Sequence, residues 1–277
     1  MEFTSPQARA RYDAVAANAS GVVVGLDFDG VLSPIVDDPE HALIHPEAPV
    51  VLRELGPRVR AIAVVTGRPA RQAIALGGLD AVGVELAAQG REFFVFGQYG
   101  NERWSATDRR VISPRPPAGL AGFERDLSVV LRSVGADDAF VEEKGLAVAV
   151  HTRRLSDPAE AFDRLLAPLT ALAERHGLVV EPGRSVIEVR APGKDKGDAV
   201  RTLAAEQDAS GFVFAGDDLG DVEAFRAVVE LREQGLSTLL ICSASEEQAA
   251  LVELADVVVD GPDGVVALLR QLAADSR

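Results

Sequence analysis

The sequence predicts an α/β protein: a doubly wound, mostly parallel sheet whose chain is interrupted by an inserted α+β domain. Uninterrupted apolar runs at residues 22–26, 61–65 and 212–215 are typical of strands buried on both faces. The segments between these runs have helical patterns, and strands that alternate with helices form parallel sheets. In the middle of the chain the order changes to helix, hairpin, helix, hairpin, which indicates a second, antiparallel sheet.

The two outer parts of the chain supply the alternating elements. Residues 31–49 are rich in proline and are expected to form an irregular loop. Pro69 suits the start of a helix, because its fixed φ is already helical. The expected helices are 7–18, 48–55, 70–76, 196–207, 220–233 and 264–273, and the expected strands are 22–26, 61–65, 93–96, 212–215, 237–242 and 257–259.

The middle of the chain begins after a proline-rich stretch, residues 113–117, which is a plausible hinge between domains. Lys144-Gly145 predicts a tight hairpin turn, and Gly177 is well placed to end a helix. The expected helices are 120–133 and 158–176, and the expected strands are 139–143, 146–151, 178–181 and 185–190. We therefore assign 1–108 and 193–277 to one domain and 109–192 to a second domain inserted into it.

The composition limits the kinds of partner. The chain has 28 basic and 43 acidic residues and a net charge of −15, which argues against nucleic acid and anionic membranes as partners. Its one cysteine, Cys242, lies in an apolar run and allows no disulfide within the chain. The first 20 residues have no apolar signal region, and no apolar run reaches transmembrane length. We expect a cytoplasmic monomer.

Two aspartates follow the first buried strand. Side chains alternate along a strand, so Asp27 and Asp29 point to the same side and Phe28 to the other. Neighbouring carboxylates at the end of a buried strand repel each other and lose hydration, which calls for a cation or a bound proton. Gly30 then allows a sharp turn in which backbone N–H groups approach an anion.

Polar residues also follow two other buried strands, as Thr66-Gly67 and as Asp217-Asp218. In open α/β sheets ligands bind beyond the carboxyl ends of the strands, so neighbouring strands would bring these groups to one site. Carboxylate oxygens suit Mg²⁺, and a hydroxyl with backbone N–H groups suits a phosphate. Lys196 begins a helix, where its charge opposes the helix dipole, and this favours an anionic partner.

Each of these residues also has a purely structural interpretation. Asp-Gly is common in turns, Asp217, Asp218 and Asp221 can cap the following helix, and Thr66 can cap another. Lys196 can be a solvated surface charge. The full set, placed in order at successive strand ends, is difficult to explain in this way.

The same residues carry a resemblance to a known family. Asp27-Phe28-Asp29-Gly30, Val65-Thr66-Gly67-Arg68, Lys196-Gly197 and Gly216-Asp217-Asp218-Leu219-Gly220-Asp221 resemble the four motifs of the haloacid dehalogenase superfamily. More narrowly, the chain resembles the trehalose-6-phosphate phosphatases over about residues 22–235. Stretches at 34–39, 141–153 and 186–190 support this narrower likeness.

The resemblance implies a haloacid dehalogenase-like core and a covalent mechanism. Asp27 would be the nucleophile that forms an aspartyl-phosphate. Asp29 would protonate the leaving sugar oxygen and then deprotonate the hydrolytic water. Thr66, Gly67 and Lys196 would bind the phosphoryl oxygens.

The resemblance also implies the cofactor and the sugar site. Mg²⁺ would be held by Asp27, the Asp29 carbonyl and Asp217, with Asp218 or Asp221 behind them, and Asp221 would orient Lys196. The inserted domain would be a mobile cap that closes over the sugar and excludes water. The implied substrate-binding residues are Glu102, Glu142, Lys144, Arg153, Arg184 and Glu188.

The chain departs from the family pattern at several positions. Val31 stands where threonine is common, so no hydroxyl is available there to hold Asp29. Gln98-Tyr99 replaces the usual residues before Gly100, including a histidine, and Arg184 replaces a common lysine. The predicted function is Mg²⁺-dependent hydrolysis of trehalose 6-phosphate, a small phosphorylated disaccharide. The alternatives are a phosphatase for another phosphorylated disaccharide or pseudo-disaccharide, and a non-catalytic sugar-phosphate sensor.

Overall fold

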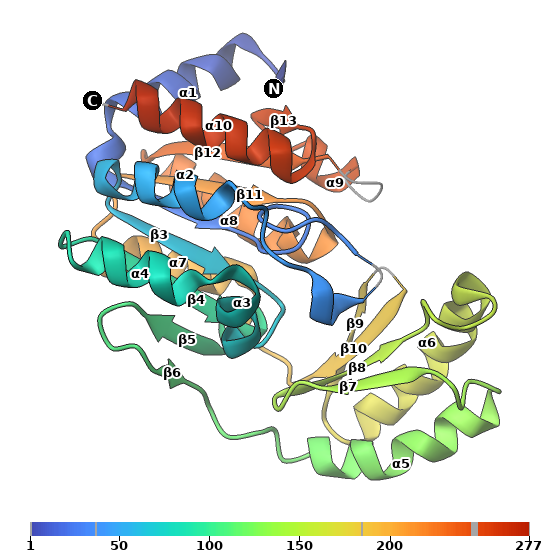
Figure 1. The fold of residues 1–277 in the computed structure, drawn as a ribbon. Helices are drawn as coiled ribbons and strands as arrows, with labels where there is room; N and C mark the ends of the chain where they lie inside the picture. The colour runs from blue at the N-terminus through green and yellow to red at the C-terminus, as the bar shows by residue number, and fades with distance from the viewer. Residues whose placement is uncertain (1, 37, 184, 245–248, 277) are drawn as a thin grey trace. The chain divides into compact units, whose positions relative to one another are not determined.

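The computed structural model describes residues 2–36, 38–183, 185–244 and 249–276 (Figure 1). The chain divides into two compact units, Met1–Ser113 with Lys194–Arg277, and Pro114–Gly193. The first unit is therefore built from both ends of the chain, and the second is a continuous insertion.

Within the described residues, the first unit contains one sheet of nine strands in the order β1-β13-β12-β11-β2-β3-β4-β5-β6. Strands β13 to β4 in this order are parallel, whereas β1, β5 and β6 pair antiparallel at the two edges. The strands are β1 Glu2–Phe3, β2 Val22–Leu26, β3 Ala61–Val65, β4 Glu92–Gly97, β5 Glu102–Ser105, β6 Val111–Ile112, β11 Gly211–Gly216, β12 Ser237–Ser243 and β13 Val257–Val259. Because β2 lies between β11 and β3, their carboxyl ends meet at one edge.

Helices cover both faces of this sheet, as expected for a doubly wound fold (Figure 1). Alternate residues of β2 pack on opposite sides: Val22, Val24 and Leu26 on one, Val23 on the other. The first side is covered by α1 Pro6–Ala17, α2 Ala48–Leu55, α3 Ala70–Gly77, α4 Leu79–Ala87 and α10 Gly261–Asp275. The other is covered by α7 Lys196–Glu206, α8 Val222–Glu233 and the short α9 Ala249–Val252.

The structure contains elements that the sequence did not predict: α4, α9, β1, β5 and β6. Helix α4 follows Gly78, whose φ of 56° ends α3 and allows the chain to start a second helix at once. Strand β5 is half polar, and its strand conformation comes from antiparallel pairing with β4, Gly97 opposite Glu102. Neither α4 nor β5 has a strong pattern of apolar residues that would predict it from the sequence.

The second unit has a four-stranded antiparallel sheet in the order β7-β8-β10-β9, within the described part of the insertion. Its strands are β7 Phe140–Glu143, β8 Ala147–His151, β9 Val179–Gly183 and β10 Val186–Arg190. Helices α5 Leu120–Ser133 and α6 Pro158–Arg175 pack on one face through a core that includes Phe123, Val148 and Ile187. The fold-class prediction, a mostly parallel main sheet with an inserted α+β domain that has its own small sheet, is confirmed.

In the part of the chain that the structure describes, no helix combines the length and the apolar character needed to cross a membrane.

Candidate active site

Asp27 and Lys196 form a buried ion pair at the carboxyl end of β2. Asp27 directly follows the strand and is 4% exposed, and its Oδ2 lies 3.0 Å from Lys196 Nζ. The Phe28 N–H donates to the other carboxylate oxygen at 2.7 Å. Lys196 is the first residue of α7, which Asp195 and Asp198 cap by exchanging hydrogen bonds. This capping accommodates a lysine at an otherwise unfavourable helix start.

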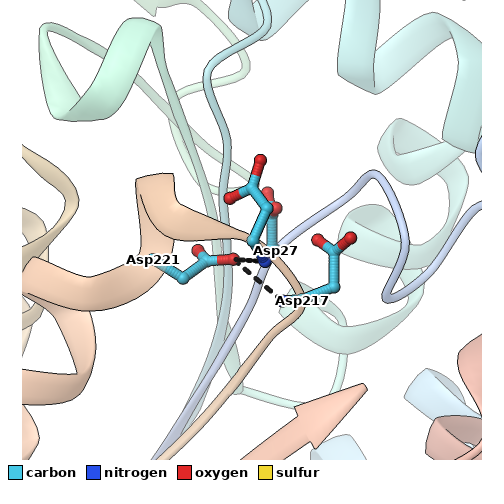
Figure 2. Close-up of side chains that lie close together, drawn as sticks. Asp27, Asp217 and Asp221 are labelled. Atoms are coloured by element: carbon cyan, nitrogen blue, oxygen red, sulfur yellow. Dashed lines mark hydrogen bonds between the residues drawn. The ribbon is translucent and has the colours of Figure 1, made fainter. Parts of the chain in front are cut away.

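Asp221 ties Lys196 to the loop after β11. Its Oδ1 accepts a hydrogen bond from Lys196 Nζ at 2.8 Å, and its Oδ2 accepts the Asp218 N–H at 3.5 Å. The same Oδ2 accepts the Asp217 N–H at 3.0 Å (Figure 2). Asp221 is fully buried. Both of its oxygens are thus engaged by the protein, which suits a residue that orients its neighbours.

Four carboxylates gather at this edge of the sheet. Oxygens of Asp27, Asp217, Asp218 and Asp221 lie within 4.8 Å of one another. Asp217 is 3% exposed, and Asp218 also accepts the Gly220 N–H at 2.9 Å, capping the short helix η5 Leu219–Asp221. Asp218 therefore caps a helix, as its purely structural interpretation predicted, and also belongs to the carboxylate cluster.

Burial and mutual repulsion disfavour ionisation of two of these acids, Asp27 and Asp217. The pKa of Asp27 is raised well above its ordinary value by burial, against the attraction of Lys196. Burial, with the charges of Asp218 and Asp27, raises the pKa of Asp217 to about 10. Burial opposes the charge of Lys196, but Asp221 and Asp27 outweigh it and raise the pKa of the ammonium group.

The donor set fits a hard divalent cation. Four carboxylates face one ammonium group, so the ionised cluster has an excess of negative charge that a divalent ion would largely neutralise. Oxygen ligands of this kind suit Mg²⁺. Asp27, Asp217 and Asp218 are the residues that would hold it, with the fully buried Asp221 behind them as the partner of Lys196 and of backbone N–H groups.

Thr66 lies at the carboxyl end of β3, beside Asp27 in the sheet order. It is 1% exposed, and its Oγ1 accepts the Arg68 N–H at 3.1 Å, which leaves its own proton for a further acceptor. Gly67 is closely covered: a Cβ there would lie 2.9 Å from the Cζ and Oη atoms of Tyr99. The ring of Tyr99 therefore packs directly on the Thr66-Gly67 turn.

Asp29 is paired with Arg68 from the same turn. Arg68 Nε donates to Asp29 Oδ2 and Arg68 Nη2 to Asp29 Oδ1, each at 2.7 Å. Val31 is fully buried in the apolar core and does not contribute to this contact. In the sequence Arg68 stands out only as part of the Thr66-Gly67 motif, and its pairing with Asp29 could not be predicted because it depends on how β2 and β3 lie together.

Glu102, a predicted sugar contact, accepts the Ala70 N–H at 2.7 Å and so caps helix α3. The turn before it, Gln98-Tyr99, is left-handed at both residues, with φ of 51° and 58°. Hydrogen bonds from Gln98 N to Arg68 O and from Tyr99 N to Thr66 O hold this turn against the site. Such backbone conformations are uncommon outside glycine and concentrate at functional sites.

Of the predicted sugar-binding residues of the second unit, Glu142 lies on β7, Glu188 lies on β10, and Lys144 lies in the turn that follows β7. Lys144 Nζ donates to Glu188 Oε2, and His151 Nε2 lies 2.9 Å from Glu142 Oε2. Glu188 is 4% exposed, and its Oε1 has no hydrogen-bond partner among the described residues. Arg153 is half-buried just beyond β8. Arg184 lies outside the described residues.

One long-range contact at the carboxyl ends of the strands was not foreseen from the sequence. Ser243, at the end of β12, donates to the Gly30 carbonyl at 2.6 Å and anchors the loop after Asp29. No local pattern marks Ser243, since its partner is 213 positions away in the chain.

Comparison with known proteins agrees with this geometry. A family model described as trehalose-phosphatase matches residues 133–257. A probable trehalose-phosphate phosphatase of Sinorhizobium fredii is 30% identical over 210 residues, covering 74% of this chain and 73% of the relative. An uncharacterized glycosyl hydrolase of Mycobacterium tuberculosis is 35% identical over 219 residues, but the match spans only 15% of that protein's length and 74% of this chain.

Solved structures share the fold. The C-terminal domain of Candida albicans trehalose-6-phosphate phosphatase matches with a TM-score of 0.75 at 17% identity, covering 97% of this chain and 96% of that one. A haloacid dehalogenase-like hydrolase from Bacteroides thetaiotaomicron matches with a TM-score of 0.61 at 13% identity, covering 90% and 98%. At these identities the likeness concerns the fold alone.

Proposed function

The chain belongs to the trehalose-6-phosphate phosphatase family of the haloacid dehalogenase superfamily, and on that premise we propose that it hydrolyses trehalose 6-phosphate to trehalose and phosphate. The observation that carries the proposal is the buried Asp27–Lys196–Asp221 chain of ion pairs beside Asp217. This arrangement supplies a carboxylate nucleophile, a fixed positive charge and an acidic metal cage at one edge of the sheet.

In the first step, Asp27 attacks phosphorus in line with the bond to the sugar oxygen. That P–O bond breaks, its electron pair goes to the sugar oxygen, and Asp29 supplies the proton. The product is an aspartyl-phosphate on Asp27 and the free sugar. Lys196, 3.0 Å from Asp27, and the Thr66 hydroxyl bind the phosphoryl oxygens and reduce their repulsion with the nucleophile.

In the second step, water attacks the phosphorus of the aspartyl-phosphate. Asp29, now ionised, accepts the water proton, and the bond between phosphorus and Asp27 breaks. Phosphate leaves and Asp27 is restored. Mg²⁺ held by Asp27, the Asp29 carbonyl and Asp217 would neutralise charge on the transferring phosphoryl group.

The sugar is assigned to the second unit, which we propose acts as a cap. Its sheet carries the buried Lys144–Glu188 pair and the Glu142–His151 pair, which are polar groups suited to hydroxyl-rich ligands. Glu188 Oε1, which has no hydrogen-bond partner among the described residues, supports this assignment, because a buried carboxylate oxygen gains from accepting a hydrogen bond from a hydroxyl group.

The test is phosphate release from a panel of sugar phosphates. We expect trehalose 6-phosphate to be hydrolysed faster than glucose 6-phosphate, with Mg²⁺ required and chelator abolishing the reaction. Asp27→Asn should lower kcat by about 10⁴-fold or more. Slow turnover of trehalose 6-phosphate beside fast turnover of another substrate would overturn the assignment.

A second candidate is a phosphatase for a related phosphorylated pseudo-disaccharide. The Tyr99 ring against Gly67 supports it, because an aromatic residue stands where the family commonly has histidine. An aminocyclitol pseudo-disaccharide phosphate in the same panel distinguishes the two. Tight binding of trehalose 6-phosphate with no phosphate release would instead indicate a sugar-phosphate sensor.

A further inference from the structure

We propose that Arg68 is the positioning residue for Asp29, fixing the carboxylate that exchanges protons with the leaving oxygen and with water. This inference rests on the proposed phosphatase chemistry. It concerns a residue that contacts Asp29 through both carboxylate oxygens, each at 2.7 Å. Two parallel N–H···O bonds from one planar guanidinium define both the position and the plane of a carboxylate, which a single bond does not.

Arg68 is the fixed member of the pair. Its side chain is 9% exposed, against 37% for Asp29. The third guanidinium nitrogen, Nη1, donates to the Pro39 carbonyl at 2.8 Å, and the group lies 5.8 Å from the centre of the Phe28 ring. The guanidinium is therefore held independently of Asp29, and the more exposed carboxylate takes its orientation from it.

The backbone of Arg68 is held by the phosphate-binding turn. Its N–H donates to Thr66 Oγ1 at 3.1 Å, and its carbonyl accepts the Gln98 N–H at 2.9 Å. One short turn thus places both the hydroxyl proposed to bind phosphate and the group that orients the acid. This gives a physical reason why Asp29 needs no hydroxyl at position 31, where Val31 is buried in the core.

The test separates the proton-transfer steps from phosphoryl transfer to Asp27. An aryl phosphate such as p-nitrophenyl phosphate releases a phenolate, which needs no acid, whereas hydrolysis of the aspartyl-phosphate still needs Asp29 as base. We expect Arg68→Met to release about one p-nitrophenolate per enzyme in a fast burst, followed by slow turnover. Steady-state kcat with trehalose 6-phosphate should fall by about 10- to 10²-fold, within the range of acid–base catalysis, with KM little changed.

A double-mutant cycle with Asp29→Asn tests whether Arg68 acts only through Asp29. We expect Asp29→Asn to lower kcat by about 10²- to 10⁴-fold, and the added Arg68→Met to have no further effect. Arg201→Met is the matched control, since Arg201 forms a two-bond pair with Glu230 at 2.9 and 3.1 Å on the exposed surface. It should keep wild-type kinetics.

Several outcomes would overturn the inference. These are wild-type kinetics in Arg68→Met, a further loss in the double variant, or a slower burst with raised KM, which would mean direct phosphate binding. If Arg68→Met fails to fold, Arg68→Lys is the test variant, because lysine keeps the positive charge but cannot form two parallel hydrogen bonds to a carboxylate. It should show the burst and about a fivefold or greater loss of kcat. Failure of the wild-type protein to hydrolyse trehalose 6-phosphate would defeat the proposed function, while the burst with aryl phosphate would still test Arg68.

Discussion

Gly30 lies against the carboxylate of Asp217, so closely that a Cβ on Gly30 would be 2.1 Å from Asp217 Oδ2. Gly30 also has a φ of 69°, in the left-handed region that L-residues rarely adopt. The glycine after Asp29 therefore serves the acidic cluster as well as the turn.

We expect Gly30→Ala to displace Asp217 and weaken Mg²⁺-dependent activity by about tenfold or more, beyond the backbone cost of about 1 kcal/mol. Gly90→Ala is the matched control, because Gly90 has a φ of 70° with no atom within 4 Å of the added Cβ. Thermal unfolding and Mg²⁺ titration of the phosphatase activity measure the two effects. Equal Mg²⁺ dependence in both variants would contradict the steric role.

Lys196→Met should destabilise the protein, because it leaves Asp27 and Asp221 buried without their cation. Loss of one partner of a buried ion pair typically costs about 3–5 kcal/mol. Activity should fall by about 10²-fold or more, since a fixed charge is lost from the transferring phosphoryl group. Urea unfolding and kinetics check this, with Lys194→Met, at an exposed position two residues away, as control. A stable, active Lys196→Met variant would contradict the assignment.

The acidic cluster predicts that stability without metal falls as pH rises. The pKa of Asp217 is raised from 3.8 to about 10, so the folded protein keeps a proton that the unfolded chain releases within this window. The free energy of unfolding should therefore decrease with pH, by at most about 1.4 kcal/mol per pH unit for one proton.

Asp217→Asn should make this slope shallower between pH 5 and pH 8.5, as measured by urea unfolding in chelator. Asp138→Asn, on the exposed surface, should leave it unchanged. Added Mg²⁺ should oppose the fall, because it binds the deprotonated acids. The same pH slope in Asp217→Asn and wild type would show that Asp217 does not carry the effect.

Thr66→Val removes a hydroxyl while keeping the shape of the side chain. It leaves the Arg68 N–H without its acceptor, at a cost of about 1–3 kcal/mol, and removes the proposed donor to phosphate. We expect kcat/KM to fall by about 10²- to 10³-fold, as for other lost donors to a developing charge. Thr66→Ser retains the hydroxyl and should recover most of the activity. An equal loss in both variants would argue against the hydroxyl.

Glu188→Gln tests the sugar-binding role of the second unit. We expect KM for trehalose 6-phosphate to rise by about tenfold, while turnover of p-nitrophenyl phosphate, which has no sugar, changes little. Glu143→Gln, an exposed neighbour of Glu142, is the control. Equal losses with both substrates would indicate a structural role for the Lys144–Glu188 pair.

The fold class and the order of the main elements could be predicted from the amino-acid sequence alone. The apolar runs at β2, β3 and β11 predicted buried strands, because only a strand covered on both faces is continuously apolar. The acidic and hydroxyl residues that end these strands predicted one shared site, and Asp27, Lys196, Asp217 and Asp221 do lie together. Two general rules are enough for these predictions. Continuous apolar runs form buried strands, and the carboxyl ends of parallel strands meet at one edge of the sheet.

The hydrogen-bond and ion-pair partners of the site residues could not be predicted in this way. The pairing of Arg68 with Asp29, the capping of α3 by Glu102 and the anchoring of Gly30 by Ser243 join residues 39, 32 and 213 positions apart. Strand β5 likewise depends on its pairing with β4. The spacing of apolar residues predicts which face of a helix or strand is buried. A hydrogen bond between distant residues depends instead on how whole helices and strands pack together.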